Sequence, residues 1–131
     1  MKKMILGACL ALTTALPLTS AAQTSAYPNQ TVKMLIGFSA GGPTDVIGRI
    51  LAQQMTMDLG QSVVVENRTG ANSLIATREV AKAKPDGYSL LFASLSHNVN
   101  KILLKDKAEY DPLASFAPVS LVANLPLVIV T

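Results

Sequence analysis

Residues 32–45 read VKMLIGFSAGGPTD, an apolar run that leads into a glycine-rich loop. The run Val32–Phe38 predicts a β-strand, and the turn-forming residues of Ser39–Thr44 predict a loop. We expect a helix to begin at Pro43 or the residue after it, because the missing N–H of a proline costs nothing at the first helical position. Asp45 would then place a carboxylate at the positive end of that helix.

Two further units of strand, loop and helix follow in the sequence. The second comprises the strand Ser62–Glu66, the polar loop Asn67–Ser73 and a helix that ends near Lys82. The third comprises the strand Tyr88–Ala93, the polar loop Ser94–Asn98 and a short helix near Val99–Leu104. Two more β-rich runs predict further strands, at Val119–Val122 and Leu127–Val130.

The first two helices each have a predicted buried side. Apolar residues recur at spacings of three and four in the first helix, which is typical of a buried helix face, and Gly60 suits its end. This face comprises Ile47, Ile50, Leu51 and Met55. The narrower buried side of the second helix comprises Leu74, Ile75 and Val80.

The alternation of strands and helices predicts an α/β fold with a parallel sheet. Such sheets bind ligands at the carboxyl ends of their strands. The loops at residues 39–44, 67–73 and 94–98 fall at those ends. We therefore expect the functional site at this edge of the sheet.

Composition excludes several classes of protein. The 131 residues allow about one domain, and with 50% apolar and 15% charged residues the chain is not a disordered tail. A single cysteine excludes an internal disulfide and a zinc site built from cysteine pairs. Without Lys2 and Lys3 the chain has nine basic against eight acidic residues. This balance gives no sign of the cluster of basic residues that is typical of nucleic-acid-binding proteins.

The N-terminus has the pattern of a secretory signal peptide. Two lysines precede the uncharged, mostly apolar run Met4–Leu16, and small residues follow Pro17. The run is shorter than the roughly 20 residues that cross a bilayer. We expect residues 1–22 to be removed by cleavage after Ala22, or alternatively after Ala26.

Six short motifs, in this order, resemble the substrate-binding proteins of tripartite tricarboxylate transporters, also called the Bug receptor family. Each is weak alone, but their order is specific. They read YP at 27–28, AGGPTD at 40–45, LGQSVVVENR at 59–68, KPDGYSLL at 84–91, YDP at 110–112 and SFAPVSLV at 115–122.

The resemblance implies an α/β, periplasmic-binding-protein-like fold with two lobes and a ligand cleft between them. Residues 23–131 would form only the first part of lobe one, so we expect a truncated chain that ends within an apolar run. It implies a periplasmic, monomeric receptor for a small carboxylate, without cofactor, metal or catalysis, that serves integral-membrane transporter subunits.

The resemblance also implies which residues bind the ligand. Gly41 and Gly42 allow main-chain N–H groups to approach an anion closely, beside a helix N-terminus. Asp45 is more typical of a first-turn capping carboxylate, although in the family an acid here can face the cleft. The expected ligand-binding residues are Phe38, Ser39, Ala40, Gly41, Gly42, Thr44, Asp45, Ser94 and His97.

Two alternatives remain open on the residues alone. Arg68 could form a bidentate pair with a carboxylate ligand or could support a turn. The chain could also be an exported α/β hydrolase or esterase that uses Ser94 or Ser96 with His97. The sequence has no Gly-x-Ser-x-Gly elbow and no acid placed as a third member, which favours the binding receptor.

The signal-peptide prediction can be tested by charge reversal. Changing Lys2 and Lys3 to Glu should impair export, because the basic start of a signal peptide directs translocation. Cell fractionation measures the exported share. The ligand affinity of the correctly processed protein should not change, and an altered affinity would show that the segment is retained.

Overall fold

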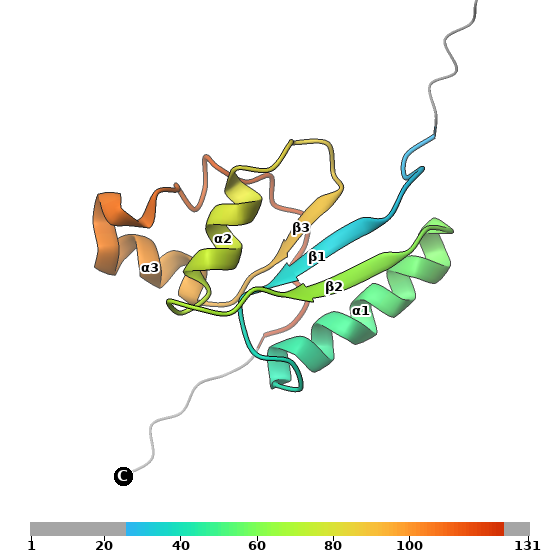
Figure 1. The fold of residues 1–131 in the computed structure, drawn as a ribbon, viewed down its shortest axis with the longest axis horizontal. Helices are drawn as coiled ribbons and strands as arrows, with labels where there is room; N and C mark the ends of the chain where they lie inside the picture. The colour runs from blue at the N-terminus through green and yellow to red at the C-terminus, as the bar shows by residue number, and fades with distance from the viewer. Residues whose placement is uncertain (1–25, 125–131) are drawn as a thin grey trace, which may run out of the picture.

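The computed structural model describes residues 26–124. They contain a three-stranded parallel sheet (Figure 1). The strands are β1 (Val32–Ile36), β2 (Val63–Asn67) and β3 (Ser89–Phe92), in the order β2-β1-β3. The predicted parallel α/β arrangement is therefore confirmed. The predicted signal peptide and the predicted strand Leu127–Val130 lie outside the described residues.

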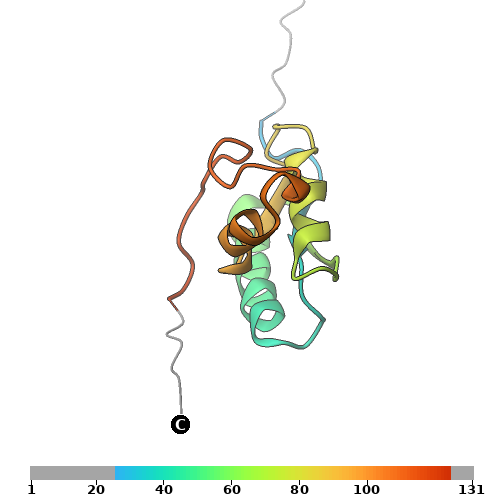
Figure 2. The ribbon, with the colours of Figure 1, turned by 90° about the vertical axis from the view of Figure 1, so that its left-hand side faces the viewer.

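Helices cover both faces of this sheet (Figures 1 and 2). They are α1 (Pro43–Leu59), α2 (Leu74–Ala81), α3 (Ser96–Leu104) and the short 3₁₀ helix η1 (Lys105–Ala108). Alternate residues of a strand point to opposite faces, so Val32 and Met34 pack with Ala52 of α1, while Leu35 faces the α2 side. The central strand β1 is thus buried on both sides, which explains its nearly continuous apolar sequence.

The first helix has the predicted ends, and Leu51 and Met55 of its predicted buried face pack against the core. It begins at Pro43 and ends at Leu59, and Gly60 caps it with a φ of 65° and an N–H that donates to the Thr56 carbonyl. Ile50, expected on the buried face, is 64% exposed. Gly48 and Ala52, which the prediction did not include, are the more deeply buried residues of this face, because small residues let the helix axis approach the strands.

Three other predictions differ from the structure. Val119–Val122 forms no strand and is exposed, because no neighbouring strand among the described residues pairs with it. Ile75 is exposed, whereas Leu74, Ala76 and Thr77 form the buried side of α2. Helix α3 begins at Ser96 rather than near Val99, so Ser96 and His97 lie in its first turn.

Within residues 26–124, none of the helices has both the length and the apolar character needed to cross a membrane. The longest, α1, is 17 residues and carries Asp45, Arg49 and Asp58. Its role in the fold is to cover one face of the sheet.

Gly37 allows the end of β1 to pass directly against the start of α2. A Cβ atom at Gly37 would lie 1.8 Å from the Ser73 Oγ and 2.5 Å from the Ser73 Cα. Because the second atom is main chain, a side-chain rotation cannot relieve the clash. The contact fixes how closely the β2–α2 loop can approach the sheet.

We therefore expect Gly37→Ala to lower the free energy of unfolding by about 3 kcal/mol or more, since the Ser73 backbone must move. Gly60→Ala is the matched control: it has open space for a Cβ but a φ of 65°, and should cost only about 1 kcal/mol. Urea unfolding of the full-length gene product measures both. Equal losses would mean that the close approach is unimportant.

Candidate functional site

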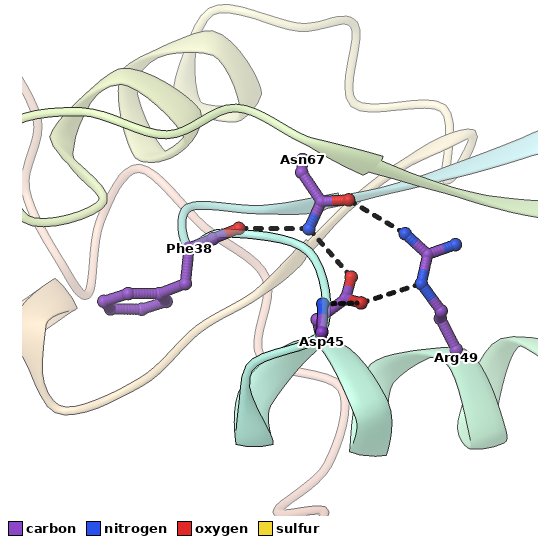
Figure 3. Close-up of polar contacts among 5 residues, drawn as sticks. Phe38, Asp45, Arg49 and Asn67 are labelled. Carbon is purple, nitrogen blue, oxygen red and sulfur yellow. Dashed lines mark hydrogen bonds and ion pairs between the residues drawn. The ribbon is translucent and has the colours of Figure 1, made fainter.

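A buried carboxylate lies at the centre of the carboxyl edge of the sheet. Asp45, in the first turn of α1, is 2% exposed. Its Oδ2 accepts the main-chain N–H of Gly41 at 2.9 Å and the Nε–H of Arg49 at 2.8 Å. Its Oδ1 accepts the side-chain amide of Asn67 at 2.8 Å (Figure 3). Both carboxylate oxygens are therefore engaged within the protein.

Asn67 connects this carboxylate to two other elements. It is the last residue of β2, and its Nδ2 also donates to the Phe38 carbonyl at 3.0 Å. Its Oδ1 accepts Nη2 of Arg49 at 2.9 Å. The phenyl ring of Phe38 points away from these contacts (Figure 3). We call Asp45, Arg49 and Asn67 the polar cluster.

The polar cluster keeps Asp45 ionised. The hydrogen bond from Arg49, then those from Gly41 and Asn67, hold the pKa of the Asp45 carboxyl well below its ordinary value, and outweigh the opposing effect of burial. The bond to Asp45 in turn raises the pKa of the Arg49 guanidinium. Asp45 therefore serves as a fixed internal anion that is already paired.

The cluster also determines which main-chain donors stay available. Gly41 has a φ of 80° and gives its N–H to Asp45, while Gly42 donates to the Ser39 carbonyl at 3.3 Å. The first bond into the helix comes from Val46 to Gly42. The N–H groups of Thr44 and Asp45 have no acceptor within residues 26–124, as expected for a helix start.

The polar residues that follow β3 form two separate groups. The hydroxyls of Ser94 and Ser96 lie 2.9 Å apart, just after β3. His97 packs instead against Tyr110 and Phe116, with ring centroids 5.4 Å and 4.8 Å away. Its Nε2 lies 3.1 Å from the Pro112 carbonyl, and its buried Nδ1 has no hydrogen-bond partner within residues 26–124.

This arrangement does not assemble the serine–histidine pair of the hydrolase alternative. Neither ring nitrogen of His97 bonds to the hydroxyl of Ser94 or Ser96. Arg68, left open between ligand contact and support, forms ion pairs with Glu66 at 3.0 Å and Glu79 at 3.5 Å. Its guanidinium is therefore shared with two carboxylates of this chain.

The strand register brings the expected site residues to one edge. Ile36 pairs with Phe92 and with Asn67, so the segments that leave β1 and β3 begin side by side. The structure thus brings Ser39–Thr44 and Ser94 to the same edge, whereas the His97 ring lies in its aromatic cluster. None of these residues is tested as a ligand contact, and all of them stay predictions.

Sequence reasoning missed the roles of Arg49 and Asn67. An acid followed four residues later by Arg on a helix indicates a side-chain pair, and an Asn at a strand end can reach the next loop. Both signals were present in the sequence, but neither shows that Arg49 and Asn67 contact each other. Their meeting depends on the packing of α1 against β2.

The rest of the described surface has no metal-binding group, and two hollows lie away from the β1–α1 loop. Residues 26–124 contain no group of three or more metal-binding side chains. A hollow of about 270 Å³ lies at the amino end of the strands, near Thr31 and Tyr88. A second, of about 350 Å³, lies beside α2, near Leu35 and Val80. Neither is lined by the β1–α1 loop.

The ionised state of Asp45 has a measurable consequence for stability. Because its pKa is lower in the folded chain than the unfolded value of about 4, its stabilising effect is full above that value and is lost as the pH falls toward the folded pKa. Asp45→Asn should therefore destabilise the protein more near pH 7 than at about pH 3 in urea unfolding. An equal difference at both pH values would contradict the role of the charge.

Relatives in sequence match most of the chain. A family model described as tripartite tricarboxylate transporter family receptor matches residues 47–131. Protein BugT of Bordetella pertussis is 44% identical over 106 residues, which are 80% of this chain and 32% of that protein. A UPF0065 protein of Agrobacterium vitis, from the TAR-I ttuE-ttuC' intergenic region, is 40% identical over 94% of this chain and 35% of its own length.

Two solved structures share the fold. The structure of a periplasmic transporter has a TM-score of 0.65 and 40% identity, over 67% of this chain and 30% of its own. MatC of Rhodopseudomonas palustris with bound malate has a TM-score of 0.57 and 34% identity, over 66% of this chain and 29% of its own. These matches confirm the predicted family and the periplasmic-binding-protein-like fold.

The chain spans about a third of the length of the curated relatives it matches. The receptor model nevertheless covers more than half of the chain. The chain belongs to the receptor family of tripartite tricarboxylate transporters.

Proposed function

We propose that this chain contributes the β1–α1 part of a binding site for a small carboxylate in a periplasmic transport receptor. The observation that carries the proposal is the start of α1, where the N–H groups of Thr44 and Asp45 have no acceptor among the described residues. Family membership and the malate bound to the similar MatC structure support the same ligand class.

The chemistry of this site needs no cationic side chain at the ligand. A carboxylate at the start of α1 would accept charge-assisted hydrogen bonds from Thr44 and Asp45 N–H and gain from the positive end of the helix dipole. The paired hydroxyls of Ser94 and Ser96 would approach from the end of β3. The Phe38 ring would supply an apolar wall.

Several of the expected site residues have revised roles in this proposal, and the His97 ring lies outside the proposed site. Ser39, Ala40, Gly41 and Gly42 shape the loop, and the Gly41 N–H is held by Asp45 rather than offered to the ligand. Asp45 acts through its main-chain N–H. His97 anchors the segment after α3 through its contacts with Tyr110 and Phe116.

The cellular context is part of the proposal. Export by residues 1–22 would deliver the receptor to the periplasm, where it would act as a monomer without a cofactor and present its ligand to membrane subunits of a transporter. The geometry of His97 supports a binding role rather than ester hydrolysis, because its ring nitrogens do not contact Ser94 or Ser96.

Calorimetry of the full-length gene product tests the proposal. The titrants are malate, other small mono-, di- and tricarboxylates, and the uncharged diamide of malic acid. At least one carboxylate should bind and the diamide should not, because the site recognises the negative charge. Failure of every carboxylate, or hydrolysis of an ester that Ser96→Ala abolishes, would overturn the proposed function.

Gly42→Val should weaken binding of the best carboxylate by about tenfold or more, which is about 1.4 kcal/mol. A side chain at Gly42 would obstruct the start of α1, yet its φ of −75° suits any residue and its Cβ would lie 3.3 Å from the Ser39 carbonyl. Gln53→Val, an exposed position on the same helix, is the control. Unchanged affinity in Gly42→Val would remove the loop from the site.

A further inference from the structure

We propose that Arg49 and Asn67 are positioning residues for the bound carboxylate. Arg49 cancels the charge of Asp45 at the first turn of α1, and Asn67 holds the β1–α1 loop through Asp45 and Phe38. Neither residue needs to touch the ligand. The inference deepens the proposed function and rests on it.

The charge balance at the start of α1 carries the first part of the argument. The N-terminus of a helix acts as roughly half of a positive elementary charge. The Asp45 carboxylate adds a full negative charge in the same turn, which would leave the turn net negative and repel an anion. The Arg49 guanidinium, 2.8 Å from the Asp45 Oδ2, restores a positive balance.

The geometry explains why an arginine serves here. Its Nε bonds to Asp45 while its Nη2 bonds to Asn67, so one planar guanidinium reaches two acceptors. The Arg49 side chain lies one helical turn beyond Asp45 and is 50% exposed. It therefore neutralises the carboxylate from the side away from the helix start and leaves the N–H groups of the first turn open.

Asn67 carries the second part of the argument. Its one amide nitrogen donates both to the Phe38 carbonyl and to Asp45 Oδ1, so the two ends of the β1–α1 loop are tied to the same strand. Asp45 then fixes the middle of the loop through the Gly41 N–H. The loop is held in one conformation before any ligand arrives, which lowers the entropy cost of binding.

The charge part is tested by calorimetry of the full-length gene product with malate. Arg49→Met should weaken binding by about tenfold, more at low than at high salt, because the unpaired Asp45 repels the anion. Arg49→Lys keeps the charge and should lose less. The double variant Asp45→Asn with Arg49→Met should recover most of the affinity, since both charges are gone.

Wild-type affinity in Arg49→Met, or a double variant no better than Arg49→Met, would overturn the charge role. Thermal unfolding of each variant separates these results from loss of fold. If the wild-type protein binds neither malate nor any other carboxylate, the proposed function fails.

The loop part is tested without any ligand, by amide hydrogen exchange. The Gly41 amide should be protected in the wild-type protein, and Asn67→Ala should speed its exchange while the Val46 amide, inside the helix, stays protected. Gly41 exchange as fast as that of the exposed Ala40 in the wild-type protein would overturn the loop role. The expected protection together with absent carboxylate binding would support the loop role and refute only the proposed function.

Discussion

The buried carboxylate of Asp45 is the constraint on which the carboxyl edge of this protein depends. A buried ion without partners is costly, so a fold that places Asp45 inside must also bring donors to it. Those donors come from the β1–α1 loop, from the next turn of α1 and from the end of β2. The need to satisfy one carboxylate thus brings three segments of the chain together.

Small residues permit the close packing that delivers these segments. Gly48 lets α1 lie near Ile36, and Gly37 lets β1 end against Ser73 at the start of α2. In return the β2–α2 loop adopts positive φ at Ala71, Asn72 and Ser73, which L-residues rarely do. Asn100 supports this loop by donating to the Asn72 carbonyl at 2.8 Å. The conformation is held by contacts with other elements rather than by local preference.

The site and the aromatic cluster around His97 show two uses of polar groups at one edge of a sheet. At α1, an internal ion pair is satisfied within the protein, and the N–H groups of Thr44 and Asp45 have no acceptor among the described residues. At α3, the His97 ring packs against the rings of Tyr110 and Phe116, and the main-chain carbonyl of His97 accepts a hydrogen bond from the Tyr110 hydroxyl. Burial raises the pKa of that tyrosine. The first arrangement suits the reception of an anion, and the second anchors the chain beyond α3.

The sequence by itself determined the order of strands and helices, the parallel sheet and the family, because these follow from local periodicity, turn residues and ordered motifs. It also placed Pro43 and Gly60 at the ends of α1, since both act through their own backbone. Only the tertiary structure decided that Ile50 faces solvent, that Val119–Val122 is not a strand and that the Gly41 N–H is occupied. The first two outcomes depend on the packing of distant segments or on the absence of a pairing strand among the described residues, and the third depends on the loop conformation that brings the Gly41 N–H to Asp45. The physical reason is that pairing and charge compensation are properties of two groups, and one-dimensional patterns describe only one of them.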